Sequence, residues 1–112
     1  MFREDARIFR LKRYPKFWWR SWRQPDHVNY HGVKLELGDH VTPEIRRDIY
    51  AERYERGEAR WLMWELEPTD IVMEIGAGMG FVSTLCAQRL GSERVFAYEA
   101  NPALIPVAAA TY

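Results

Sequence analysis

Apolar and polar residues alternate between residues 27 and 37, on both sides of His31-Gly32. A period of two is typical of a strand with one buried face. Because Gly32 readily adopts the positive φ of a tight turn, the pattern predicts a β-hairpin, with His31 as a turn residue. The residues expected on its buried face are Val28, Tyr30, Val33, Leu35 and Leu37.

A helical pattern follows and begins at Thr42-Pro43-Glu44. A capping hydroxyl, a proline in the first turn and an acid near the positive helix end are signals of a helix start. The helix is expected to run to about Arg56 and to be broken by Gly57. Its predicted buried face holds Ile45, Ile49 and either Tyr50 or Tyr54.

A second helix is predicted from about Glu58 to Glu67, with Pro68 ending it. Its apolar residues include Trp61 and Trp64. This helix should cover a sheet, so we expect both tryptophans to be packed in the core.

The apolar run from Asp70 to Ile75 has few polar interruptions, which fits a strand buried on both faces of a parallel sheet. A glycine-rich segment follows at once. The next helix, predicted from about Met79 to Leu90, has apolar residues at helical spacing and ends at Gly91. The residues on its apolar face are Val82, Leu85, Cys86 and Leu90.

A second strand is predicted from Arg94 to Tyr98, and Glu99 follows it directly. A further helix starts either at Asn101-Pro102 or nearer Ile105, since Pro106 leaves its first residue open. The order strand, glycine loop, helix and strand predicts a βαβ unit, for which a right-handed crossover is expected.

The segment 1–26 is basic and aromatic, and we treat it as an arm separate from the domain of residues 27–112. The arm holds eight Lys/Arg and three Asp/Glu, and the remainder holds eight and thirteen, so the two parts carry +5 and −5. Its aromatic residues fall partly at helical spacing, in two groups that Pro15 separates. The first group is Phe2 and Phe9, with Ala6 between them, and the second is Trp18 or Trp19 with Trp22.

Three interpretations of the arm stay open, of which we prefer packing of its aromatic residues onto the body. The second is a peripheral, interfacial contact with a membrane, since Trp with Lys/Arg is typical of membrane-surface segments. The third is an arm that faces a sugar acceptor. The positive charge fits either an acidic body or an anionic partner, and we do not favour nucleic acid.

Composition indicates a folded globular protein, with 47% hydrophobic and 29% charged residues among 112. The single cysteine, Cys86, allows no internal disulfide and is expected to be a packed thiol. The three histidines are irregularly spaced and have no cysteine nearby, so no metal site is assigned. Since there is neither a signal-peptide pattern nor a run of roughly 18 apolar residues, we expect a cytoplasmic protein.

The candidate chemistry lies in the glycine loop and in the acid after the second strand. A nucleotide bound at the end of a parallel strand needs small residues in a sharp turn, which Gly76, Gly78 and Gly80 provide. It also needs an acid at the end of the neighbouring strand to accept hydrogen bonds from ribose hydroxyls. Glu99 follows Gly76 at close to the separation of roughly 20 residues that is usual for such units.

The loop spacing favours S-adenosylmethionine (SAM) over a dinucleotide. A dinucleotide loop has Gly or Ala where this chain has Phe81, and its pyrophosphate would be repelled by Glu74. SAM has no phosphate, and its cationic amino and sulfonium groups favour a nearby carboxylate. A nicotinamide-linked oxidoreductase therefore remains only a disfavoured alternative.

The segment Glu74-Ile75-Gly76-Ala77-Gly78-Met79-Gly80 resembles motif I of class I SAM-dependent methyltransferases, and Tyr98-Glu99-Ala100-Asn101-Pro102 resembles the motif whose acid binds ribose. With Gly32-Val33-Lys34-Leu35 and Arg53-Tyr54-Glu55, residues 28–112 resemble the FkbM family. That resemblance places the Tyr54-Glu55 pair near the methionine end of the cofactor; the equally open alternative is an aromatic residue at a helix end that packs over the core, next to a solvated acid. The candidate cofactor-binding residues are Tyr54, Glu74, Gly76, Ala77, Gly78, Gly80, Phe81, Glu99 and Asn101.

The resemblance implies O-methylation of a hydroxyl on a sugar, glycan or other natural-product acceptor. It also implies an α/β fold: a partial Rossmann-like class I methyltransferase fold, reduced to its first βαβ unit and preceded by a hairpin and two helices. The parent fold has a larger sheet, and Tyr112 falls inside a predicted helix. We therefore expect an N-terminal part of the domain that binds SAM weakly or not at all and is inactive alone, with no catalytic residue assigned.

The alternative function is a non-catalytic binding module. In this hypothesis the βαβ unit is a remnant, and the basic aromatic arm binds a membrane surface or nucleic acid.

Overall fold

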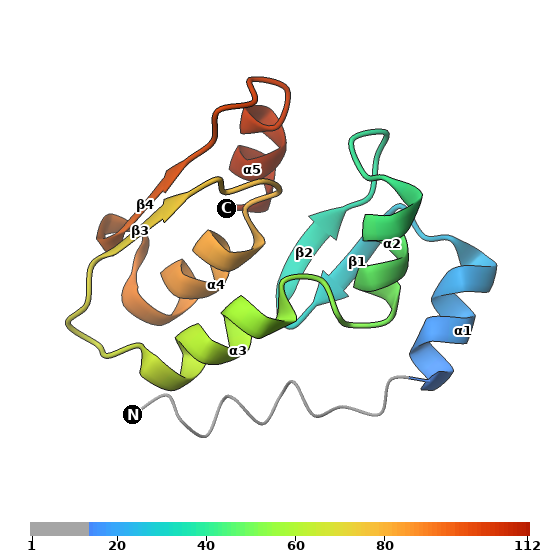
Figure 1. Ribbon diagram of the computed structural model, residues 1–112, viewed down its shortest axis with the longest axis horizontal. Coiled ribbons are helices and arrows are strands. Elements are labelled where there is room, and N and C mark those ends of the chain that lie inside the picture. The colour runs from blue at the N-terminus through green and yellow to red at the C-terminus, as the bar shows by residue number, and fades with distance from the viewer. Residues whose placement is uncertain (1–13) are drawn as a thin grey trace.

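The computed structural model describes residues 14–112 and contains two separate two-stranded sheets (Figure 1). One is an antiparallel hairpin of β1 (His27–Tyr30) and β2 (Val33–Glu36), and the other pairs β3 (Val72–Ile75) with β4 (Val95–Tyr98) in parallel. The helices are α1 (Tyr14–Arg23), α2 (Pro43–Tyr50), α3 (Arg56–Glu65), α4 (Phe81–Leu90) and α5 (Ile105–Thr111), with a 3-10 turn at Ser92–Arg94. The predicted mixed α/β class is confirmed. The predicted helical pattern of Phe2, Ala6 and Phe9 falls on residues outside the described range.

The hairpin has the predicted register and the predicted buried face. Val28 pairs with Leu35 and Tyr30 with Val33, and all four side chains are buried. His31 and Gly32 form the turn with φ values of 51° and 84°. Positive φ at both turn residues matches the right-handed twist of the strands, so this two-residue loop closes the hairpin without splaying them.

The α2 helix begins where the sequence predicts but ends earlier than expected. The Thr42 hydroxyl accepts a hydrogen bond from the backbone N–H of Ile45, 3.3 Å away, as an N-cap does. The expected end at Arg56 is wrong, because Glu52 adopts a φ of 58° after the helix ends at Tyr50. The Glu52 carboxylate forms a buried ion pair with Arg20 of α1, 3.6 Å away.

The prediction that Gly57 separates the two helices is also wrong. Gly57 lies within α3, which begins at Arg56 after Glu55 has turned the backbone with a φ of 46°. Trp61 and Trp64 of this helix are exposed, against our expectation of core packing. The reason is the orientation of α3, which turns Ala59 and Met63 inward, and these two side chains are fully buried.

The tryptophans of α1 also differ from the preferred prediction, since Trp18, Trp19 and Trp22 are exposed. Phe17 does pack against the core. The inward side of α1 is instead occupied by Arg20, whose guanidinium is buried between α1, β1 and α2. Among the α1 aromatic side chains that the structure describes, Phe17 therefore contacts the body and the three tryptophans face outward.

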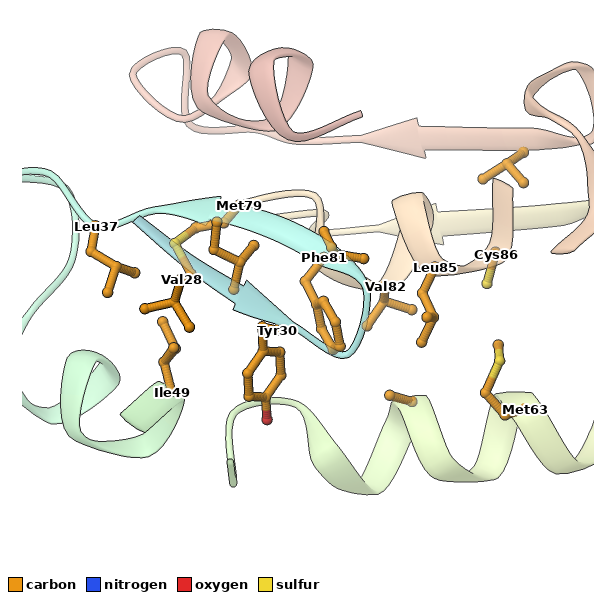
Figure 2. Packing of buried hydrophobic residues seen from close by; sticks show 14 of the residues in the cluster. Val28, Tyr30, Leu37, Ile49, Met63, Met79, Phe81, Val82, Leu85 and Cys86 are labelled. Atoms are coloured by element: carbon orange, nitrogen blue, oxygen red, sulfur yellow. The ribbon is translucent and has the colours of Figure 1, made fainter. Parts of the chain in front are cut away.

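The core lies between the hairpin and the helices α2, α3 and α4. Figure 2 shows Tyr30 of β1 and Phe81 of α4 side by side, with Ile49 of α2 near Val28 and Met63 of α3 pointing toward Cys86 of α4. The ring centroids of Tyr30 and Phe81 are 4.9 Å apart in an edge-to-face arrangement. This packing joins the hairpin to the first turn of α4, which is where the glycine loop ends.

The parallel sheet is covered on one face only. Helix α4 packs on β3 and β4, and Val95 is buried beneath it. The expected burial of the first strand on both faces is wrong, because no helix among the described residues covers the other side. The large apolar side chains exposed on and beside these strands are Ile71, Met73, Ile75, Phe96 and Tyr98.

The last helix starts at Ile105, the second of the two predicted starts, and it carries Pro106 in its first turn. Within residues 14–112, no helix is long and apolar enough to cross a membrane.

Candidate functional site

The glycine loop, residues 76–80, lies between β3 and α4 at the edge of the parallel sheet where both strands end. Ile75 pairs with Tyr98, so the two strands end side by side. The backbone N–H groups of Gly76 and Ala77 both donate to the carbonyl oxygen of Tyr98, at 2.8 and 3.0 Å. The loop is thus attached to the end of β4, as the predicted βαβ site requires.

The three glycines of the loop all adopt positive φ, with values of 84° at Gly76, 57° at Gly78 and 79° at Gly80. At Gly80 there is a second constraint, because a Cβ there would lie 3.0 Å from the carbonyl oxygen of Ala108 in α5. A side chain would therefore strain the backbone and push α5 away. The predicted need for small residues in this turn is confirmed.

Glu99 bridges the loop and the segment after β4 with both of its carboxylate oxygens. Oε2 accepts the backbone N–H of Gly78 and Oε1 accepts that of Asn101, each at 2.8 Å. These hydrogen bonds hold the pKa of Glu99 below its ordinary value, so the group is ionised. A carboxylate has about four acceptor positions. Two are used here, and the remainder can accept hydroxyl groups of a ligand.

Asn101 and Ala77 have local roles around Glu99. The Asn101 side chain accepts the backbone N–H of Ala103 at 3.0 Å, an Asx turn that orients the chain after β4. Ala77 is buried beneath the loop. The structure brings both residues to the predicted site, and their part in binding a cofactor stays a prediction.

Glu74 and Glu55 approach each other from β3 and from the residue before α3. Both line a hollow of about 350 Å³ that reaches Gly76. Each has a buried carboxylate oxygen, Oε2, with no hydrogen-bond partner among the described residues. The hollow therefore has unused hydrogen-bond acceptors that a donor from a ligand can meet.

The electrostatics of this hollow follow from two carboxylates in a partly buried position. Burial, followed by the negative charge of Glu74, raises the pKa of Glu55 to about 7. Burial also raises the pKa of Glu74, against the effect of hydrogen bonding by Ser83. Glu58 at the rim adds a third acid. Such a cluster favours a cationic ligand, which would relieve the repulsion and stabilise the ionised forms.

Tyr54 stands at the junction of the acidic hollow and the loop. Its hydroxyl lies 3.8 Å from the point that a Cβ on Gly78 would occupy. Burial, and next the adjacent Glu55 charge and hydrogen bond, raise the pKa of Tyr54 above its ordinary value, so the phenol stays protonated. Its backbone carbonyl accepts the hydroxyl of Tyr30 at 2.9 Å, which ties the position of Tyr54 to the hairpin.

Phe81 lies at the site only through its backbone. Its ring is fully buried in the core, 6.2 Å from the Tyr54 ring centroid, and points away from the glycine loop (Figure 2). A role for Phe81 in cofactor binding thus stays a prediction that concerns its main chain. As a core residue, the ring holds the start of α4 in place.

A second hollow, of about 580 Å³, opens on the other side of the loop, between β4, α4 and α5. It extends from Ala77 and Glu99 to Ile105 and Ala108. Among the described residues that line the two hollows there is no Lys or Arg. Neither hollow therefore offers a side-chain cation for a pyrophosphate.

The structure brings together Tyr54, Glu74, Glu99 and the glycine loop, as the sequence predicts. Of the two other acids in the hollow beside Glu74, Glu55 was expected near the cofactor only through the family resemblance, and Glu58 was not predicted at the site. The sequence signal for Glu55 was its place beside Tyr54. No pattern pointed to Glu58, which was expected only as the first residue of a helix. Among the described residues, no group of three or more His, Cys, Asp or Glu side chains is arranged to hold a metal ion.

No protein-family model, curated protein or solved structure matches this chain. The resemblance to the FkbM family therefore stays a prediction from the residues, and the cofactor has to be inferred from the geometry of the site.

Proposed function

We propose that the chain binds S-adenosylmethionine across the glycine loop, as part of a class I SAM-dependent methyltransferase. The observation that carries the proposal is Glu99, an ionised carboxylate fixed at the end of β4 and 2.8 Å from the N–H of Gly78. Its spare acceptor positions stand beside a loop that can approach a ligand without side-chain obstruction. This combination is what a ribose at the end of a parallel strand needs.

The two hollows fit the two ends of this cofactor. The hollow beside Glu99 is lined largely by apolar atoms of β4 and α5, which suits an adenine ring. The hollow beside Glu74 is acidic, which suits an ammonium and a sulfonium group. A dinucleotide fits less well, because its pyrophosphate would lie against the loop next to acids and without a side-chain cation.

When bound, SAM supplies an electrophilic methyl group. The residues described here would act by positioning the cofactor. Glu99 would hold the ribose, the glycine loop would contact the part of SAM between its two ends, and Glu55 and Glu74 would hold its amino end. The acceptor, a hydroxyl on a sugar or another natural product, follows only from the family resemblance. No described residue is assigned as the general base.

A titration followed by amide NMR tests the proposal, because it detects millimolar as well as micromolar binding. We expect SAM and S-adenosylhomocysteine to shift the amide signals of Gly76, Gly78, Gly80 and Asn101. The affinity should be weaker than micromolar, because one face of the parallel sheet is uncovered. Glu99→Gln should abolish the shifts, since an amide cannot accept both N–H groups and a ribose hydroxyl.

The matched control is Glu93→Gln, which changes an exposed acid in the 3-10 turn before β4 and should leave the titration unchanged. If SAM shifts no loop signal at millimolar concentration, or if NADH shifts the same signals more strongly, the proposed cofactor is wrong. The non-catalytic binding module stays an alternative prediction. It requires that neither SAM nor NADH shifts the loop signals.

A further inference from the structure

Helix α1 presents three tryptophans to solvent on the side that faces away from the body. Trp18, Trp19 and Trp22 are 69%, 56% and 77% exposed. On a helix of 100° per residue they fall within about 100° of the circumference, so they form one stripe. Burial of large apolar surface is the main favourable term in folding, and three adjacent exposed tryptophans mark a surface with another role.

The orientation of this stripe is determined by the opposite side of α1. Arg20 is buried there, 3.5 Å from the carbonyl of Ile49 and 3.4 Å from those of Tyr50 and Asn29. Its ion pair with Glu52, at 3.6 Å, is almost free of solvent. A buried guanidinium with these partners holds α1 in one rotation about its axis. With Arg20 directed inward, the tryptophans on the other side of α1 face outward.

Positive charge accompanies the tryptophan stripe. The Arg23 guanidinium carbon lies 5.3 Å from the Trp22 ring centroid, in a cation–π arrangement at the end of the helix. Lys16, at the other end of α1, is instead paired with Glu52 at 3.6 Å, so its charge is partly compensated on the side that faces the body. In sequence the whole segment 1–26 carries +5. The stripe is thus complementary to an anionic partner with an apolar layer beneath its surface.

We propose that this tryptophan face, made of Trp18, Trp19 and Trp22 with Arg23, docks on the surface of an anionic lipid bilayer. Indole rings suit the boundary between headgroups and acyl chains, because each has an apolar body and one N–H donor. The helix lies beside α2 at the margin of the molecule, where a flat surface can reach it (Figure 1). A ten-residue helix is far too short to span, so docking would be peripheral.

Co-sedimentation of the full chain with lipid vesicles tests this proposal. We expect the chain to sediment with vesicles of phosphatidylcholine mixed with phosphatidylserine, and much less with phosphatidylcholine alone. Trp18→Ala, Trp19→Ala and Trp22→Ala combined should lower the partition coefficient more than about tenfold. Arg23→Gln should lower it about fivefold on the anionic vesicles only, since only anionic headgroups attract the positive charge.

The matched control is Trp61→Ala with Trp64→Ala, which removes two exposed tryptophans from α3 and should leave the partition coefficient unchanged. Thermal melts of both sets of variants should show that each stays folded at the assay temperature, so that a loss of binding is not a loss of the fold. Equal binding by the two sets, or no sedimentation of the parent chain, would overturn the proposal. Binding to a single-stranded RNA oligonucleotide that competes with the vesicles would also contradict it, in favour of base stacking.

Discussion

The carboxylate of Glu55 should make the stability of this protein depend on pH in a specific direction. Its pKa is raised from 4.5 to about 7, first by burial and next by the charge of Glu74. The folded chain therefore binds a proton more tightly at this position than the unfolded chain does. The resulting stabilisation is complete below about pH 4.5 and is lost as the pH rises through about 7.

The magnitude follows from the pKa difference. A tenfold change in an acid dissociation constant corresponds to about 1.36 kcal/mol, so the whole effect is about 3 kcal/mol, most of it between about pH 5 and pH 8. Glu74 acts in the same direction, because its pKa is also raised. His31 acts in the opposite direction, because burial lowers its pKa and its protonation in acid disfavours the folded state.

Urea unfolding of the parent chain and of Glu55→Gln at several pH values isolates this contribution. We expect the free energy of unfolding of the parent, relative to the variant, to fall by about 2.5 kcal/mol between about pH 5 and pH 8. Glu65→Gln, at an exposed position in α3, the helix that Glu55 precedes, should follow the parent at every pH. A difference between parent and Glu55→Gln that does not change with pH would refute the reasoning.

Two further pairs of variants test the loop and the core. Gly80→Ala should destabilise the fold by about 1–3 kcal/mol in a thermal melt, because φ is 79° and the Cβ would crowd Ala108, whereas Gly57→Ala in α3 should be neutral or slightly stabilising. An unchanged melting temperature for Gly80→Ala would contradict the strained loop. Leu85→Ala should cost about 2–5 kcal/mol in urea unfolding, and Ile75→Ala, which is 82% exposed on the uncovered sheet face, less than about 0.5 kcal/mol. Equal costs for these two would mean that the exposed sheet face is buried in solution.

The two proposals concern opposite parts of the molecule and can fail separately. If SAM did not shift the loop signals, the proposal for the tryptophan face of α1 would still stand. If the chain did not bind vesicles, the proposal for the glycine loop would still stand. If both hold, the chain would join a cofactor site to a membrane-surface contact, and α1 would set the orientation of the glycine loop toward the bilayer.

The elements whose signals lie within a short stretch of chain were predictable from the sequence. The hairpin follows from alternation around His31-Gly32, and the start of α2 from Thr42-Pro43. The glycine loop and Glu99 also follow, because two parallel strands joined by one helix bring the acid after the second strand to the sheet edge where the loop lies. The hairpin turn and the start of α2 each need one local conformation, whereas the loop and Glu99 need only the pairing of two strands that one helix joins.

The features that the sequence did not reveal depend on contacts between distant residues. The early end of α2 and the outward tryptophans of α1 both accompany a contact between distant residues, because Arg20 on the inward side of α1 is buried against Glu52, which follows α2. The raised pKa of Glu55 depends on Glu74, which belongs to another element. Periodicity shows which residues can share a face, but burial of a charge requires its partner. Only the tertiary structure therefore decides which face turns inward and which acids meet.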